Sequence, residues 1–122
     1  MTKKRLTLGR KGEELARGFL EKKGVVILEQ NFRTRSGEID LIGREGKTLV
    51  FVEVKTRSSR QYGHPLEAVT ARKRAQLTRV ALEYLSRNAL YDQPARFDVV
   101  SVLAEEGKPE VEVVRNAFEV NC

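Results

Sequence analysis

The stretch that decides the fold is GEIDLIGREGKTLVFVEVKT, residues 37–56. Residues 48–56 form the most apolar strand pattern in the chain, and residues 37–43 form a second strand pattern before them. The connection between the two patterns, residues 44–47, is short and contains a glycine. We therefore predict an antiparallel hairpin whose two strands lie near the centre of a sheet.

Further helical and strand patterns flank this hairpin on both sides. Apolar residues recur at helical spacing over residues 7–23, which Gly24 can cap, and over residues 70–88, where Thr70 can act as the N-cap. Shorter apolar runs predict strands at residues 25–28, 97–103 and 111–114. The predicted order is helix, three strands, helix, two strands. This order describes an α/β domain with a mixed five-stranded sheet flanked by helices.

The hairpin carries three charged residues that we expect to meet. Successive side chains of a strand point to opposite faces, so Glu53 and Lys55 project together from one face of the second strand. On the first strand Asp40 lies between Ile39 and Leu41, which we expect to share one face. The hairpin can then bring Asp40 beside Glu53. Two carboxylates and an amine would converge on one point.

Such a convergence of charges predicts a metal-dependent phosphodiesterase. Two close carboxylates repel each other unless a proton or a cation lies between them, and hard oxygen ligands suit Mg²⁺ or Mn²⁺. A bound ion activates an attacking water and neutralises charge on the transition state, while a nearby ammonium orients the nucleophile. Asp40 and Glu53 are the candidate metal ligands, and Lys55 is the candidate residue that assists the water.

The context of Glu53 carries more information than its Glu-x-Lys pattern. That pattern occurs four times in the chain, and the other three lie in a helix end and in two turns. Glu53 and Lys55 instead interrupt an apolar strand, where charges cost free energy unless they are paired or coordinated. A plain ion pair of Lys55 with Glu53 or Asp40 on a solvated sheet face is the structural alternative.

Two further acids lie close to the predicted site. Glu13 is on the border of the buried stripe of the first helix, so it could reach over the sheet toward a metal. A solvated acid on the flank of the helix is an equally simple interpretation. Glu38 shares a face with Asp40, and we interpret it as a solvated strand residue.

A positive charge balance favours a polyanionic partner. Lys and Arg exceed Asp and Glu by 23 to 17, which gives a net charge of +6. Several polar and basic residues follow the acidic strand, and a phosphate backbone could cross the site along them, although each taken alone is more simply a solvated helix charge. These candidates are Arg57, Arg60, Arg72, Lys73, Arg74 and Gln76. Nucleic acid, with DNA as the expected type, is the predicted partner.

The bulk properties of the chain exclude several other classes of protein. Its 122 residues suit one domain, residues 1–122, and no stretch approaches the roughly 18 apolar residues that span a bilayer. The basic start of the chain leads into a polar helix rather than an apolar signal segment. A single cysteine, Cys122, can build neither a disulfide framework nor a thiolate metal site. We predict a cytoplasmic protein that has no contact with membranes.

Three segments together resemble the YraN family of bacterial proteins. They are Gly12-Glu13, residues 37–42 (GEIDLI) and residues 51–57 (FVEVKTR), and the similarity covers nearly the whole chain. The resemblance implies an endonuclease distantly similar to archaeal Holliday junction resolvases, with a restriction-endonuclease-like core. Branched DNA is then a candidate substrate, and the two-fold symmetry of a junction would favour a homodimer.

The resemblance assigns roles to four residues of this chain. It makes Asp40 and Glu53 the metal ligands, Lys55 the assistant of the attacking water and Glu13 the helix acid of the resolvase pattern. The chain departs from the wider superfamily in having Ile39 rather than proline before Asp40, and that superfamily includes members without catalysis. A non-catalytic nucleic-acid-binding module with the same fold is therefore the second functional hypothesis. A scaffold domain that binds neither metal nor nucleic acid is the third hypothesis.

Overall fold

Two helices and five strands make up the part of the chain that the computed structural model describes, which is residues 3–57, 67, 69–103 and 109–118. In chain order they are α1 (Lys3–Lys22), β1 (Val26–Thr34), β2 (Gly37–Glu45), β3 (Thr48–Arg57), α2 (Ala71–Arg87), β4 (Ala95–Leu103) and β5 (Glu110–Phe118). The predicted α/β class and order of elements are confirmed. Within the described ranges, neither helix is both long and apolar enough to cross a membrane.

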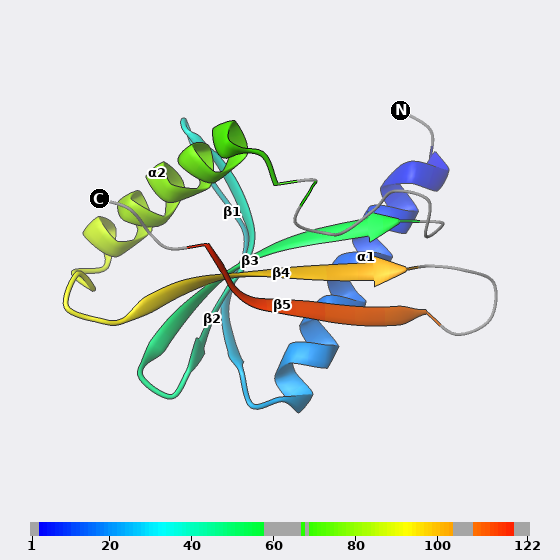
Figure 1. Cartoon of the computed structure of the whole chain (residues 1–122), viewed down its shortest axis with the longest axis horizontal. Helices are drawn as coiled ribbons and strands as arrows, with labels where there is room; N and C mark the ends of the chain where they lie inside the picture. The colour runs from blue at the N-terminus through cyan, green and yellow to red at the C-terminus, as the bar shows by residue number, and fades with distance from the viewer. Residues whose placement is uncertain (1–2, 58–66, 68, 104–108, 119–122) are drawn as a thin grey trace.

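The five strands form one sheet in which spatial order follows chain order, β1-β2-β3-β4-β5. Consecutive strands are antiparallel except β3 and β4, which run parallel and are connected through α2. The predicted hairpin of β2 and β3 is confirmed, with Glu45 paired to Thr48 across a two-residue turn. Figure 1 shows the sheet with α1 and α2 placed away from each other on either side of it. The mixed sheet is therefore covered on both faces.

The central strand β3 supplies a hydrophobic core to each face of the sheet. Phe51 points to the α2 side, where its ring lies 6.0 Å from that of Tyr84 and 5.3 Å from that of Phe97. Val50 and Val52 point to the other side and pack with residues of α1. Because both faces of β3 are buried, its sequence is a nearly continuous apolar run rather than an alternation.

Helix α2 begins and ends where the sequence predicts. The Thr70 hydroxyl accepts a hydrogen bond from the backbone N–H of Lys73 at 3.2 Å, and Asn88 is the C-cap. The buried face of α2 carries the predicted apolar stripe, with Leu77, Val80, Ala81, Tyr84 and Leu85. Gly24, after α1, has a φ of +96°, which glycine adopts without a steric cost.

The outer strands are longer than the sequence predicts. β1 extends to Thr34 rather than ending at residue 28, and β5 spans Glu110–Phe118 rather than residues 111–114. Both strands lie at edges of the sheet, where most of their side chains are exposed or half-buried. Strand residues that face water carry no apolar pattern, so hydropathy marked only part of each strand.

The expectation that Ile39 and Leu41 share one face of β2 is wrong. Ile39 belongs to the core on the α2 side, whereas Leu41 belongs to the core on the α1 side. The strand therefore changes face at Asp40. Across from Asp40 on β1 lies Asn31, whose φ of 53° is in the left-handed region. This local irregularity removes both residues from the regular ladder.

Helix α1 lies close to β3 at Gly12. A Cβ atom at this position would overlap the Thr56 side chain. We expect Gly12→Ala to lower the free energy of unfolding by about 1–2 kcal/mol, because overpacking outweighs the better helix propensity of alanine. Urea denaturation of Gly12→Ala, Thr56→Ala and the double variant would measure this. The double variant should recover most of the loss, and a Gly12→Ala protein as stable as the wild type would contradict the close contact.

Candidate active site

Asp40 and Glu53 meet where the pairing of β2 and β3 ends. The last paired residues of the ladder are Leu41 and Val52, so Asp40 and Glu53 occupy the next step. There the backbone N–H of Val54 donates to the Asp40 Oδ2 atom at 2.8 Å instead of to a carbonyl of β2. A carboxylate thus replaces the backbone partner, and the acidic pair lies in the opening between the two strands.

The Glu53 side chain is buried and incompletely bonded. It is 5% exposed, and its Oε2 atom has no hydrogen-bond partner among the described residues. The Nζ atoms of Lys55 and Lys73 each lie 3.5 Å from this oxygen. Two ammonium groups therefore balance the charge of Glu53 at ion-pair distance without satisfying the hydrogen-bonding capacity of its buried oxygen. A buried carboxylate oxygen in this state is costly unless another group completes its surroundings.

The same surroundings raise the pKa of Asp40 from 3.8 to about 8. Burial contributes most, and a hydrogen bond with Glu53 and the negative charge of Glu53 add to it. The charge of Glu13 raises the pKa further, while the Val54 N–H stabilises the ionised form and lowers it. Asp40 therefore holds a proton at neutral pH. A cation between the two carboxylates would take the place of that proton.

Glu13 reaches this region from α1 but is held by another residue. The Asn31 side-chain amide donates to Glu13 Oε1 at 3.0 Å and to Oε2 at 3.4 Å. Glu13 influences Asp40 through its charge, and its contact with a metal stays a prediction. The role of Asn31 was not found in the sequence. An asparagine in a polar strand segment does not by itself indicate a functional residue. Asn31 stands out only because its backbone is left-handed, which the sequence does not show.

The donor set suits a hydrated divalent cation. Among the residues with a described position, no three His, Cys, Asp or Glu side chains come together to hold a metal. The protein could supply Asp40 and the free oxygen of Glu53, and water would complete the coordination. Mg²⁺ usually retains several waters and needs only one or two carboxylates, so the residues present fit this ion or Mn²⁺.

Lys73 lies in the site rather than on the outer surface of α2. The sequence grouped Lys73 with the residues that could contact a phosphate backbone. Its ammonium instead contacts Glu53, two residues along β3 from Lys55. Helix α2 packs mainly against β2 and β1, and from there the Lys73 side chain reaches Glu53 on β3.

Two other predicted nucleic-acid contacts have partners within the protein. Arg57 Nη2 donates to the Ser101 hydroxyl at 3.1 Å. Arg74 Nε donates to the Val69 carbonyl at 3.0 Å, and its guanidinium lies over the ring of Phe118 at 5.3 Å. Both arginines therefore stabilise the fold near the site, and their contacts with nucleic acid stay predictions.

The remaining candidates lie at the surface near α2 or outside the described part of the chain. Arg72 is exposed in the first turn of α2. Gln76 lies against Gly37, at the start of the strand that carries Asp40. Arg60 lies outside the described residues. Glu38 forms an ion pair with Arg33 at 3.3 Å, as a partly solvated acid would.

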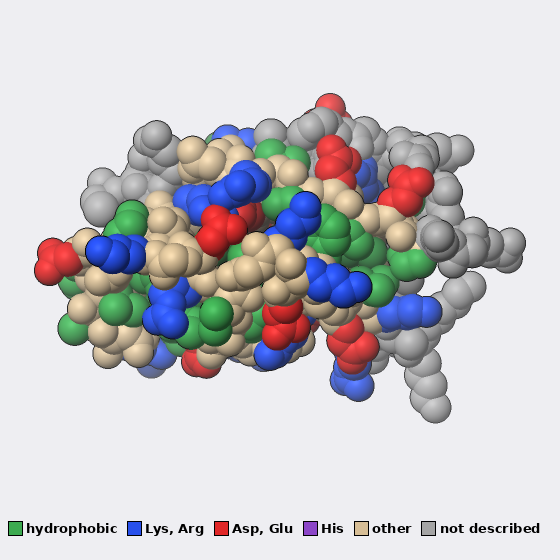
Figure 2. Space-filling view, turned by 90° about the horizontal axis from the view of Figure 1, so that it is seen from below, with side chains coloured by type: hydrophobic (Ala, Val, Ile, Leu, Met, Phe, Trp, Pro, Cys, Tyr) green, Lys and Arg blue, Asp and Glu red, His purple; other side chains and the backbone are tan. Residues whose placement is uncertain are grey.

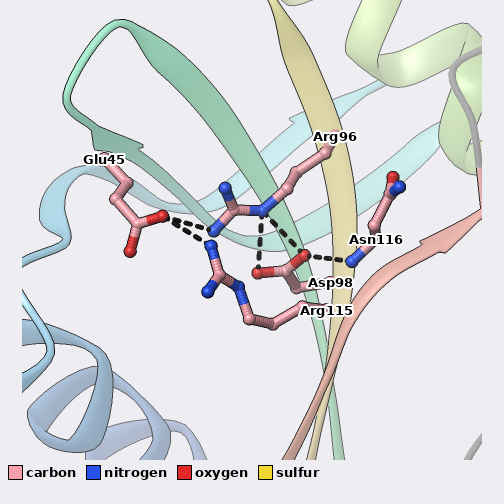
Figure 3. A network of polar contacts seen from close by, with 5 residues as sticks. All are labelled: Glu45, Arg96, Asp98, Arg115 and Asn116. Carbon is pink, nitrogen blue, oxygen red and sulfur yellow. Dashed lines mark hydrogen bonds and ion pairs between the residues drawn. The ribbon is translucent and has the colours of Figure 1, made fainter.

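A second polar cluster joins β2, β4 and β5 (Figure 3). Arg96 donates from Nε to Asp98 Oδ1 at 3.1 Å and from Nη2 to Glu45 Oε1 at 3.1 Å. Arg115 also donates to Glu45, at 2.8 Å, and the Asn116 backbone N–H donates to Asp98 at 2.8 Å. Asp98 is 1% exposed. Its carboxylate, unlike that of Glu53, has hydrogen-bond partners on both oxygens. We therefore interpret this cluster as one that connects the three strands and stabilises the fold.

The net positive charge does not gather into one broad patch on the face that Figure 2 shows. Lys and Arg side chains alternate there with Asp and Glu side chains. A polyanion would therefore meet mixed charges on this face.

The protein is of the α/β class, and at the end of its central hairpin a half-buried Asp40 and a buried Glu53 meet two lysines. Residues 12–102 match the Uncharacterised protein family UPF0102. The chain belongs to this family, which is the YraN family that the sequence resembles. The resemblance is therefore confirmed.

Individual relatives are similar over nearly their whole length. A UPF0102 protein of Geobacter metallireducens is 50% identical over 114 residues, which are 93% of each chain. A UPF0102 protein of Syntrophomonas wolfei is 50% identical over 111 residues, which are 91% of this chain and 96% of the relative. One from Geobacter sulfurreducens is 46% identical over 93% of this chain and 89% of its own length.

Proposed function

We propose that the protein is a metal-dependent endonuclease that hydrolyses phosphodiester bonds of nucleic acid, with DNA as its substrate. The observation that carries this proposal is the buried Oε2 atom of Glu53, which has no hydrogen bond to any residue in the described ranges and lies beside Asp40 and two ammonium groups. An arrangement that only stabilised the fold would be expected to satisfy this oxygen, as the Asp98 cluster satisfies its carboxylate.

Each residue of the site has a distinct task in this proposal. Asp40 and Glu53 would hold a Mg²⁺ or Mn²⁺ ion, which would activate the attacking water and neutralise charge on the transferred phosphate. Lys55 orients that water and stabilises negative charge, since its strand fixes it beside Glu53. The Val54 N–H keeps the Asp40 carboxylate directed into the opening. Glu13, held by Asn31, adds negative charge that favours a cation.

The wider setting follows from the same proposal. Arg57, Arg72 and Arg74 lie on or next to the elements that form the site and would contact the phosphate backbone. A substrate with two-fold symmetry, such as a branched DNA, would suit a homodimer that acts in the cytoplasm. One observation favours the alternative of a non-catalytic binding module: the two lysines already balance the charge of Glu53 without any metal.

A cleavage assay separates these two functions. Labelled linear, flapped and four-way-junction DNAs would be incubated with Mn²⁺ or with a chelator. The proteins would be the wild type, Lys55→Met, Glu53→Gln and the control Lys47→Met, an exposed lysine in the β2–β3 turn. Cleavage should require Mn²⁺ and should fall about 100-fold or more in Lys55→Met and Glu53→Gln. Lys47→Met should cleave like the wild type.

The binding of the same DNAs would be measured in parallel. We expect Lys55→Met to retain most of its affinity for DNA while it loses cleavage. If the wild type binds DNA equally well with and without metal and cleaves none of the substrates, the protein is a binding module and the acids have a structural role.

A further inference from the structure

We propose that Lys73 couples metal binding to nucleic-acid binding, by holding Glu53 in the metal-free protein and moving to a substrate phosphate once a divalent cation occupies the acidic pair. This inference rests on the proposed function and adds a positioning residue to it. Its basis is the contact of Lys73 with Glu53 at 3.5 Å, which equals the distance of Lys55 from the same oxygen.

The position of Lys73 on its helix is unfavourable for a cation. It lies in the first turn of α2, between Arg72 and Arg74, and this turn contains no acidic residue. The N-terminus of a helix carries a partial positive charge and stabilises anions rather than cations. Helix energetics alone therefore do not account for a lysine here. Its contact with Glu53 compensates locally, and an incoming phosphate would compensate in the same way.

The metal-free site already has as many ammonium groups as carboxyl groups. Asp40 and Glu53 supply two carboxyl groups, and Lys55 and Lys73 supply two ammonium groups. With a divalent cation held by the same carboxylates, both ammonium groups would lie a few ångströms from a like charge and would be repelled. At least one of them must then move away or gain an anionic partner.

Lys73 is the lysine that is free to move. Lys55 starts two residues from Glu53 on the same strand and the same face, so the sheet keeps its ammonium close. Lys73 reaches Glu53 from a different element, so β3 does not hold its ammonium in place, while the side chains of the two lysines are similarly exposed, at 34% for Lys73 and 30% for Lys55. Its backbone is held by the Thr70 cap, but its flexible stem can turn toward the N-terminus of α2. A phosphate at that helix end would be bound by N–H groups and by Lys73 together.

Calorimetry with Ca²⁺ tests the proposal without relying on cleavage, because Ca²⁺ binds the same kind of oxygen ligands. The proteins would be the wild type, Lys73→Met, Lys73→Arg and the control Lys47→Met. In the absence of DNA, Lys73→Met should bind Ca²⁺ about fivefold more tightly than the wild type, since a competing cation is gone. Lys73→Arg and Lys47→Met should resemble the wild type. A lysine that only stabilises the site would give the opposite result, weaker Ca²⁺ binding.

DNA binding provides the second readout. Ca²⁺ should raise the affinity of the wild type for a four-way-junction DNA about fivefold or more, and Lys73→Met should lose most of this gain. Unchanged or weaker Ca²⁺ binding by Lys73→Met, or a full Ca²⁺ effect on its DNA affinity, would overturn the role of Lys73. The proposed nuclease would survive that result if the wild type still cleaves with Mn²⁺. A wild type that binds no divalent cation would overturn both.

Discussion

Replacing Asp40 with asparagine is expected to reduce Mn²⁺-dependent cleavage by about 10³-fold, which corresponds to about 4 kcal/mol in the activation barrier. The same change should make the metal-free protein more stable at alkaline pH. The introduced side chain would be neutral, its amide oxygen could still accept the Val54 N–H, and its amide nitrogen could donate to Glu53. The substitution would remove a metal ligand and at the same time relieve the repulsion between the half-buried carboxylate of Asp40 and the buried carboxylate of Glu53.

The sign of the stability change follows from the raised pKa of Asp40. The folded protein binds the Asp40 proton more tightly than the unfolded chain, with a pKa of about 8 instead of 3.8. The stability that this proton provides is complete below pH 3.8 and is lost as the pH rises through 8. The Asp40→Asn variant lacks this loss. The excess of its free energy of unfolding over that of the wild type should be absent near pH 4 and should reach about 2–5 kcal/mol above pH 8.

Thermal unfolding at pH 5, 7 and 9 with a chelator would measure this difference. The melting temperature of Asp40→Asn should exceed that of the wild type by several degrees at pH 9 and by much less at pH 5. Added Mn²⁺ should stabilise the wild type and leave the variant almost unchanged. An equal difference at every pH would show that Asp40 does not hold a proton in the folded protein.

Replacing Arg96 with methionine is expected to have the largest effect on the stability of the fold. Arg96 is the partner of Asp98, whose side chain is 2% exposed, and it also contacts Glu45. Without the guanidinium, the buried Asp98 carboxylate keeps the Asn116 N–H as its one hydrogen-bond donor among the residues that the structure describes. Removing one partner of a buried ion pair costs about 3–5 kcal/mol, because the other charge remains without compensation. The expected loss in melting temperature is about 10 °C or more.

Arg115 offers a matched control for this prediction. Its side chain is 64% exposed and also contacts Glu45, so Arg115→Met should cost less than about 1 kcal/mol. Replacing Asp98 with asparagine in the Arg96→Met protein should restore much of the loss, because the buried charge is then absent. Urea denaturation would compare the four proteins. Equal losses of stability in Arg96→Met and Arg115→Met would contradict a stabilising buried ion pair between Arg96 and Asp98.

The hairpin and the meeting of its acids were predictable from sequence because they depend on local geometry. A two-residue turn fixes the register of β2 and β3, and this register places Asp40 across from Glu53. Alternation along β3 then places Lys55 on the same face as Glu53. The caps of α2 were predictable for the same reason, since Thr70 and Asn88 act within one turn of the helix.

Other parts of the site depend on packing that no local pattern encodes. The contact of Lys73 with Glu53 requires the angle at which α2 crosses the sheet. The change of face at Asp40 lies across from the left-handed backbone of Asn31 on the neighbouring strand, and neither has a pattern in the sequence. Asp98 is a different case, because it interrupts an apolar strand as Glu53 does. Its burial with a charged partner could therefore have been predicted from its context in the sequence.

Successive side chains of β3 point to opposite faces of the sheet, and this affects which genetic changes the protein can tolerate. Val50 and Val52 serve the core beside α1, Phe51 serves the core beside α2, and Glu53 serves the site. A substitution at one of these positions disturbs one of the two cores or the site, but not all three. An in-frame deletion of a single codon within the strand would instead move every following side chain to the opposite face. The gene should therefore accumulate missense changes in this segment far more readily than codon losses or insertions.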